Sequence, residues 1–327
     1  MSGSDALRAG EMFELAGDFL DAAATYGSVL NDPDPLVVAE ARFRLGRVAW
    51  KQGRFDEAVS HFGVARHLAV SHGSSAVRAL VENGLGVIHH ERGELEQARA
   101  CYGVALDLAQ DDAQRGRILL NLGAIANIQA DFETARKHYQ RSRALFQHSA
   151  YARGEALALH NLGMLYADEG LWDEADESYR QCLEILEALG DRPMIARVLL
   201  NRSEVSCARE RFDEAISNCD LAITICSEVG DEVERGDALR WKGHGLRLMG
   251  RHDSAQKALT EAIRIAARTQ VKLLEAESSR DMGHSLAATG DHAGAHKRLE
   301  RALRLFEELG AQLDVADVRA AIAAIAR

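Results

Sequence analysis

The fold is decided by a pattern that is clearest in residues 162–182, which read LGMLYADEGLWDEADESYRQC. Counted from Gly163 as an anchor, a glycine follows after seven residues (Gly170), an alanine after twelve (Ala175) and an aromatic residue after sixteen (Tyr179). Spaced by 36 to 40 residues, the equivalent anchors are Gly10, Gly46, Gly86, Gly123, Ser203, Gly243 and Gly283. The chain of 327 residues therefore contains about eight copies of one unit.

The offsets within each unit describe two helices. Alanine follows all eight anchors by twelve residues, at Ala22, Ala58, Ala98, Ala135, Ala175, Ala215, Ala255 and Ala295. Glycine follows six of the eight by seven residues, and Ala130 and Glu210 are the exceptions. Positions twelve, sixteen and nineteen residues after the anchor share one helical face. Each unit is predicted to be a helix, a tight turn and a helix. One such pair cannot bury its apolar stripe, so the units must stack into a solenoid.

These residues resemble the tetratricopeptide repeat. The resemblance rests on the turn glycine, the small residue, the following aromatic residue and the Leu-Gly pairs Leu45-Gly46, Leu85-Gly86, Leu122-Gly123 and Leu162-Gly163. The period exceeds the family's usual length of about 34 residues. In this respect it is similar to the sensor arms of bacterial regulators and to cell-polarity scaffolds. The resemblance implies an all-α, right-handed superhelix whose first helices line a concave, protein-binding groove.

We expect a single solenoid over residues 1–327, because no linker or change in composition interrupts the repeats. The predicted repeats cover about 3–38, 39–78, 79–115, 116–155, 156–195, 196–235, 236–275 and 276–311. Residues 312–327 are predicted to form a capping helix. The alternative for this last segment is that a longer protein has been cut here.

Composition excludes several classes of protein. The net charge is −11, with 39 basic and 50 acidic residues, which disfavours binding to nucleic acid or to an anionic membrane surface. No apolar run is long enough to span a membrane, and the N-terminus does not have the pattern of a signal peptide. The five cysteines contain no Cys-x-x-Cys pair and lie in helical patterns. We therefore expect a cytoplasmic protein.

Three asparagines occupy one register of the predicted groove, since Asn121, Asn161 and Asn201 each stand two residues before an anchor. Packing does not dictate the residue at this position. An amide side chain both donates and accepts hydrogen bonds, so this row could hold the backbone of an extended peptide. The alternative is that the amides bond to neighbouring helices.

Basic and aromatic residues surround the asparagine row. The remaining predicted partner-binding residues are Arg44, Arg47, Lys51, Asn83, Arg117, Arg197, Arg240, Trp241, His244, Arg247 and Arg280. Basic groove residues in an acidic chain favour a protein or peptide segment, with an acidic segment as one candidate. The alternative is a solvated face with internal salt bridges. Trp241 is the best single anchor for a partner unless it packs against Arg280 or the next repeat.

No catalytic residue, metal site or cofactor is predicted. In His89-His90-Glu91 the two imidazoles take different helical faces, and the chain has no His-Glu-x-x-His motif. Acidic pairs such as Asp173-Glu174 recur after the turns and mark helix starts. The sequence therefore predicts a non-catalytic adaptor in bacterial signalling or regulation. The alternatives are a peptide-sensing regulator that changes superhelical pitch and, as a separate class, an enzyme. Self-association through the end repeats is also expected.

Overall fold

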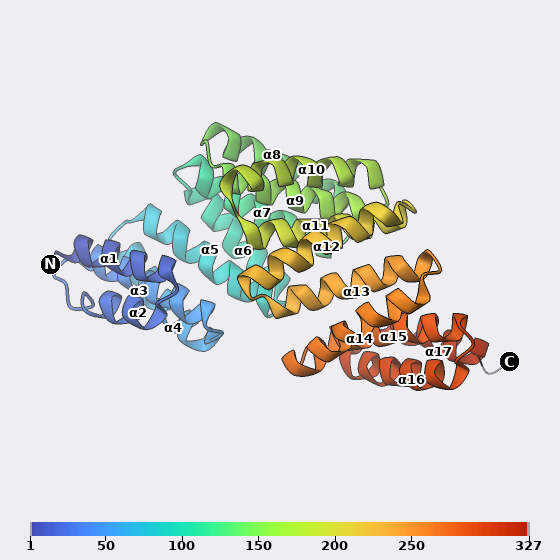
Figure 1. Cartoon of the computed structure of the whole chain (residues 1–327). Coiled ribbons are helices and arrows are strands. Elements are labelled where there is room, and N and C mark those ends of the chain that lie inside the picture. Colours follow the sequence, from blue (N-terminus) through green and yellow to red (C-terminus); the bar gives the residue numbers. More distant parts are fainter. Residues whose placement is uncertain (1, 326–327) are drawn as a thin grey trace. The chain divides into compact units, whose positions relative to one another are not determined.

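The structure is a computed structural model that describes residues 2–325, and over this range it contains seventeen α-helices and no strand (Figure 1). The helices are α1 (Gly3–Ala16), α2 (Phe19–Gly27), α3 (Pro35–Lys51), α4 (Phe55–Ser71), α5 (Ser75–Glu91), α6 (Leu95–Leu108), α7 (Asp112–Ile128), α8 (Phe132–His148), α9 (Ala152–Asp168), α10 (Trp172–Leu189), α11 (Arg192–Ala208), α12 (Phe212–Val229), α13 (Glu232–Leu248), α14 (His252–Thr269), α15 (Lys272–Ala288), α16 (His292–Leu309) and α17 (Gln312–Ile325). Odd-numbered helices up to α15 are the first helices of the predicted repeats. The last two positions of the predicted capping helix lie outside the described residues.

The helices form two compact units, residues 1–161 and 162–327, and the division falls inside α9. In the first unit α3 contacts both α1 and α5, and α5 contacts α7. In the second unit α13 contacts both α11 and α15, and α15 contacts α17. Within each unit the first helices thus form a layer against which the second helices pack. A single solenoid over the whole chain stays a prediction.

Predicted repeat boundaries fall inside the first helices. The boundary at residue 196, for example, lies within α11, which begins at Arg192. Helix starts are set by the caps, because Gly190 ends α10 in the left-handed conformation and the Asp191 carboxylate accepts a hydrogen bond from the Met194 amide. Gly230 and Asp231 repeat this arrangement between α12 and α13.

The small anchor of each first helix packs against the side chain sixteen residues later. A Cβ atom at Gly123 would lie 2.5 Å from the Tyr139 ring, and one at Gly46 would lie 2.6 Å from the Phe62 ring. The missing side chain therefore gives the ring its place and lets the two helices approach closely. Tyr139 and Phe62 are both buried.

Ser203 is the one anchor that is not glycine. Its hydroxyl donates a hydrogen bond of 2.8 Å to the Leu199 carbonyl, and its side chain is buried. Sixteen residues later stands Cys219 in place of a ring, with its Sγ atom 3.4 Å from the Ser203 hydroxyl. The larger anchor is thus matched by a smaller partner than the rings and leucines of the other repeats.

The turn between paired helices uses a left-handed residue. Gly53, Gly93 and Gly250 have φ angles of 73°, 74° and 73°. Ala130 and Glu210, the two exceptions in the sequence pattern, adopt the same conformation with φ of 57°. The geometry of the repeat therefore imposes this backbone conformation even where no glycine is present.

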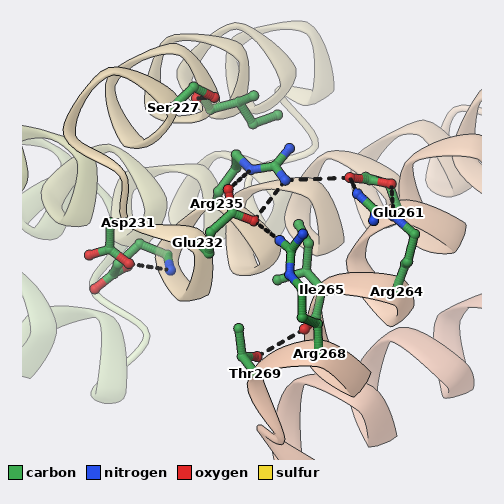
Figure 2. A network of polar contacts seen from close by, with 11 residues as sticks. Ser227, Asp231, Glu232, Arg235, Glu261, Arg264, Ile265, Arg268 and Thr269 are labelled. Carbon is green, nitrogen blue, oxygen red and sulfur yellow. Dashed lines mark hydrogen bonds and ion pairs between the residues drawn. The ribbon is translucent and has the colours of Figure 1, made fainter.

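Charged side chains join the ends of paired helices, and Figure 2 shows one such network between α13 and α14. The Arg235 guanidinium donates to Glu232 at 2.9 Å and to Glu261 at 3.4 Å. Arg268 bonds to Glu232, and Arg264 bonds to Glu261. Each guanidinium in this network has a carboxylate partner.

We predict that Gly123→Ala lowers the free energy of unfolding by about 1–2 kcal/mol, because overpacking against the Tyr139 ring outweighs the higher helix propensity of alanine. The matched control is Gly103→Ala on α6, where a Cβ atom meets nothing within 4 Å. This control should raise stability by about 0.5–1 kcal/mol. Urea denaturation of both variants checks the prediction, and equal effects of the same sign would contradict it.

Candidate functional site

The predicted partner-binding residues all lie on first helices, from α3 to α15. Those up to Asn161 belong to the first unit and those from Arg197 onward to the second.

In the first unit, the predicted cations Arg47 and Lys51 converge on one buried carboxylate. Glu14 of α1 is 3 % exposed, and it accepts from Arg47 at 2.6 Å and lies 3.0 Å from the Lys51 ammonium. The Tyr26 hydroxyl donates to the same carboxylate at 3.2 Å. Burial alone would raise the pKa of Glu14, but the hydrogen bonds and charges of Arg47 and Lys51 outweigh it and lower the pKa.

Arg44 is paired in the same way. Its guanidinium lies 2.9 Å from Glu11 of α1 and 3.0 Å from Glu40 of α3. The predicted basic residues of α3, which are Arg44, Arg47 and Lys51, are therefore matched by three carboxylates from the first two repeats. This arrangement corresponds to the alternative of internal salt bridges.

Two of the three asparagines are engaged with neighbouring side chains. Asn121 of α7 donates to the Asn83 side chain of α5 at 3.2 Å, which joins two successive first helices. In the second unit, Asn201 is hydrogen-bonded with the hydroxyl of the buried Tyr179. Asn161 is half-buried on α9. Because an amide has several donor and acceptor sites, Asn121 retains capacity for a further partner.

The remaining arginines outside α13 are also in contact with other groups. Arg117 lies 5.8 Å from the centre of the Tyr151 ring. Arg197 donates to Glu234 at 2.9 Å. Arg280 bonds to Asp314 of α17 at 2.6 Å, and its guanidinium lies 5.6 Å from the centre of the Phe306 ring.

The densest group of predicted residues lies on α13. Arg240 is 7 % exposed, and its Nε atom lies 3.3 Å from Glu277 of α15. Its guanidinium also stacks on Trp241, 4.3 Å from the centre of the ring. Trp241 meets the His244 ring edge-on at 5.5 Å. Trp241 is thus held by its own helix, and its ring remains half-buried.

A buried carboxylate organises the next part of this group. Asp281 of α15 is 1 % exposed, and it lies 3.0 Å from Nδ1 of His244 and 3.4 Å from the Arg247 guanidinium. Burial would raise the pKa of Asp281, but the hydrogen bond from His244 and the nearby cations lower it instead. Asp281 therefore remains ionised and fixes both α13 side chains.

At two other carboxylates of this region the pKa is raised. Desolvation raises the pKa of Asp237 on α13 to about 6, with Glu277 adding to the effect and Arg240 opposing it. Desolvation also raises the pKa of Glu204 on α11, and Asp168 and Glu277 add their negative charges. Acidic groups thus outnumber the cations here.

Together these contacts define one surface, which we name the C-terminal polar face. It consists of Glu204 on α11, of Asp237, Arg240, Trp241, His244 and Arg247 on α13, and of Glu277 and Asp281 on α15. It offers a half-buried aromatic ring, a buried cation at Arg240, a buried carboxylate at Asp281 and more exposed carboxylates around them. Such a surface can hydrogen-bond a polypeptide and cover an apolar side chain of a partner.

The predicted set missed the carboxylates that complete this surface and its counterpart around Arg44. Glu14 stands four residues after Gly10, and Glu11 one residue after it. In the predicted set, Arg247 stands four residues after Gly243 and Arg47 one residue after Gly46, so applying these two offsets to the first repeat would have found both carboxylates. In the described residues, no three His, Cys, Asp or Glu side chains form a group that could hold a metal ion. None of the helices there has the length and apolar character needed to cross a membrane.

Glu14→Gln is expected to lower the free energy of unfolding by about 2 kcal/mol at neutral pH, because charged hydrogen bonds at a buried site are lost. Since the pKa of Glu14 is lowered by folding, its contribution is complete above the ordinary glutamate value of 4.5 and is lost as pH falls through the lowered value. The difference between wild type and variant should therefore shrink in acid.

Urea denaturation at a series of pH values measures this effect. The control is Glu133→Gln, which removes an exposed pair with Lys137 on α8 and should change stability by less than about 0.5 kcal/mol. A pH-independent loss in Glu14→Gln would contradict the assignment.

The model of the tetratricopeptide repeat matches residues 37–111, 76–148, 114–188, 194–268 and 234–308. No curated protein sequence matches the chain at a significant level. Among solved structures, a Rap protein complexed with competence and sporulation factor is similar, with 14 % identity, a TM-score of 0.66 and coverage of 99 % of this chain and 97 % of that one. Aspartyl phosphate phosphatase F from Bacillus subtilis has 11 % identity, a TM-score of 0.60 and coverage of 100 % and 94 %.

A third similar structure is a signal transduction ATPase with numerous domains and a tetratricopeptide repeat sensor, from Pyrococcus horikoshii. It has 15 % identity and a TM-score of 0.75, and the match covers 96 % of this chain and 49 % of that one. At these identities the likeness concerns the fold, and it confirms the predicted class of all-α helical-repeat superhelix. Because the repeat model matches most of its length, the chain belongs to the tetratricopeptide repeat family.

Proposed function

We propose that this chain is a non-catalytic adaptor that binds a protein or peptide segment on its first helices, in bacterial signalling or regulation. The observation that carries the proposal is the C-terminal polar face, where Arg240 and His244 of α13 hold a half-buried tryptophan beside carboxylates of α13 and α15. Trp241 is stacked on Arg240 and braced by His244, so its ring is ordered before a partner arrives. An ordered aromatic ring loses little entropy on binding.

The similar structures support a role in binding. One of them is a Rap protein in complex with competence and sporulation factor, and another carries its repeats as a sensor. A third is named as an aspartyl phosphate phosphatase. Since function depends on sites and not on the fold, the proposal of a non-catalytic role rests on this chain's own residues.

The ion pairs within the chain bear on which charge a partner can carry. Arg44, Arg47 and Arg240 have carboxylate neighbours within 3.3 Å. An acidic segment, which the sequence favours, must displace these internal carboxylates to reach the cations. We therefore propose that backbone hydrogen bonds to the asparagines, and not charge, supply most of the affinity on the first helices.

Self-association through the end repeats remains part of the proposal. Leu20 on α2 is 83 % exposed and Leu313 on α17 is 89 % exposed. Exposed apolar side chains of this size at both ends are suited to contacts with a second copy.

The test of the adaptor proposal starts from peptides selected by display against the full chain. The triple variant Asn121→Ala, Asn161→Ala, Asn201→Ala should bind the selected peptides at least about tenfold more weakly, because the amides that hold the peptide backbone are removed. A second variant, Trp241→Leu, should weaken binding independently. Fluorescence anisotropy gives the affinities, and circular dichroism checks that helicity is retained.

The control is Lys137→Ala, which removes an exposed side chain from the second helix α8. It should leave the affinity unchanged. If the asparagine and tryptophan variants fold and bind with wild-type affinity, the first helices are not the binding surface. Failure to select any peptide would also contradict the proposal.

A second candidate is a peptide-sensing regulator that changes superhelical pitch when a ligand binds. The division of the chain into two compact units favours it, because each unit can keep its own packing while a ligand changes the superhelix. Small-angle scattering with and without a selected peptide separates the two candidates. An adaptor should keep the same scattering profile, whereas a regulator should change it.

A further inference from the structure

A surface pocket between α4 and α5 lies in the first unit and has a volume of about 380 Å³. We name it the α4–α5 pocket. It is lined by Gly63, Arg66, His67 and Val70 of α4 and by Arg78 and Glu82 of α5. The space beside Gly63 is open, since a Cβ atom at this position would meet nothing within 4 Å.

The charges of the α4–α5 pocket are not balanced. Glu82 is 5 % exposed and is the pocket's one carboxylate, whereas Arg66 and Arg78 both face it. The Arg66 Nη1 atom lies 3.9 Å from Glu82 and the Arg78 Nε atom lies 3.7 Å from it. Both distances exceed that of a hydrogen bond. The pocket therefore holds two guanidinium groups and an imidazole against a single buried carboxylate.

The hydrogen-bonding capacity of these arginines is also unused. The Arg78 Nε atom is buried and has no hydrogen-bond partner in the described structure. A guanidinium has five N–H donors in a planar fork that matches the oxygens of a carboxylate or a phosphate. Two such forks facing one pocket present more donors than Glu82 can accept.

The repeat register shows that this pairing is unusual. Arg66 stands twenty residues after its anchor and Arg78 eight residues before the next one. At the junction of α8 and α9 the same two positions are Arg143 and Glu155, whose opposite charges meet at 3.3 Å. An ion pair at that junction is thus replaced at α4–α5 by two like charges.

Arg235 gives a second comparison, because it occupies the same register as Arg78. Figure 2 shows Arg235 bonded to Glu232 and Glu261, so its charge is matched by carboxylates of its own helix pair. Arg78 has no carboxylate at such distances, and its nearest is Glu82 at 3.7 Å. The stacking of repeats therefore does not require an uncompensated arginine at this position.

We propose that the α4–α5 pocket binds an oxyanion, a carboxylate or phosphate group, between Arg66 and Arg78. The two guanidinium groups donate hydrogen bonds to its oxygens, and His67 lies at the wall of the pocket to add a further donor. Glu82 keeps the arginines in place and limits the net positive charge. This site goes beyond the proposed adaptor function, since it uses none of the residues of the asparagine row or of the C-terminal polar face.

The probes are inorganic phosphate and glutarate, titrated into the full chain at constant ionic strength with chloride as the reference anion. Chemical shifts or calorimetry should show saturable binding of at least one probe in the millimolar range. Binding of phosphate alone indicates a phosphate group as the natural ligand, and binding of glutarate alone indicates a carboxylate. Arg66→Gln and Arg78→Gln should each weaken the binding about tenfold, because charge-assisted hydrogen bonds are lost.

Two further variants separate the site from a general charge effect. Arg143→Gln removes the arginine at the register position equivalent to Arg66 and should leave the affinity unchanged. Glu82→Gln removes the negative charge that opposes an anion, so it should tighten binding of the probes. If Glu82 only stabilised the helix pair, the substitution would not tighten binding.

The proposal is overturned if neither probe binds more strongly than chloride, or if Arg143→Gln weakens binding as much as the pocket variants do. The same holds if folded Arg66→Gln and Arg78→Gln proteins retain wild-type affinity. The triple asparagine variant should bind the probes normally, so that failure of this site and failure of the adaptor proposal give different results.

Discussion

The contact between a small anchor on each first helix and the side chain sixteen residues later is the constraint on which the rest of the structure depends. A Cβ atom would lie 2.4 Å from the partner ring at Gly163 and 2.6 Å from the Leu259 side chain at Gly243. This close approach fixes how the two helices of a repeat cross. It also decides which residues of the first helix remain available, because the anchor side is taken by the second helix. The free polar surfaces of both units follow from it.

The remaining side of the first helices is built from charges that neutralise one another across repeats. Glu14 binds cations of the following repeat, and Asp281 binds side chains of the preceding one. Both carboxylates are buried, so each stabilises its neighbours only while its partners stay charged. Against this background of matched charges, the two arginines facing Glu82 stand out. Both lie beyond hydrogen-bonding distance of Glu82, so their N–H donors remain available to a ligand.

The sequence predicts the repeats well because their period is imposed by packing. The turn glycines and the alanine and aromatic positions are identified by offset alone, and even Ala130 and Glu210 adopt the backbone conformation that the register demands. The site is less predictable. A period shows that Arg47 and Asn121 share a face, but it does not show that Glu14 and Asn83 lie within reach of them. Such partners come from neighbouring repeats, and their side-chain conformations depend on the stacking of the helices.

The central claim is that anchor size and partner size are coupled, and a double-mutant cycle at Ser203 and Cys219 tests it most directly. Cys219→Tyr alone should destabilise the protein because its ring has no room beside serine, and Ser203→Gly alone should leave a gap. Combining them restores the arrangement of the other repeats. The account predicts that the double variant is more stable than the sum of the single effects by about 1–3 kcal/mol. Simple additivity of the two effects in urea denaturation would contradict it.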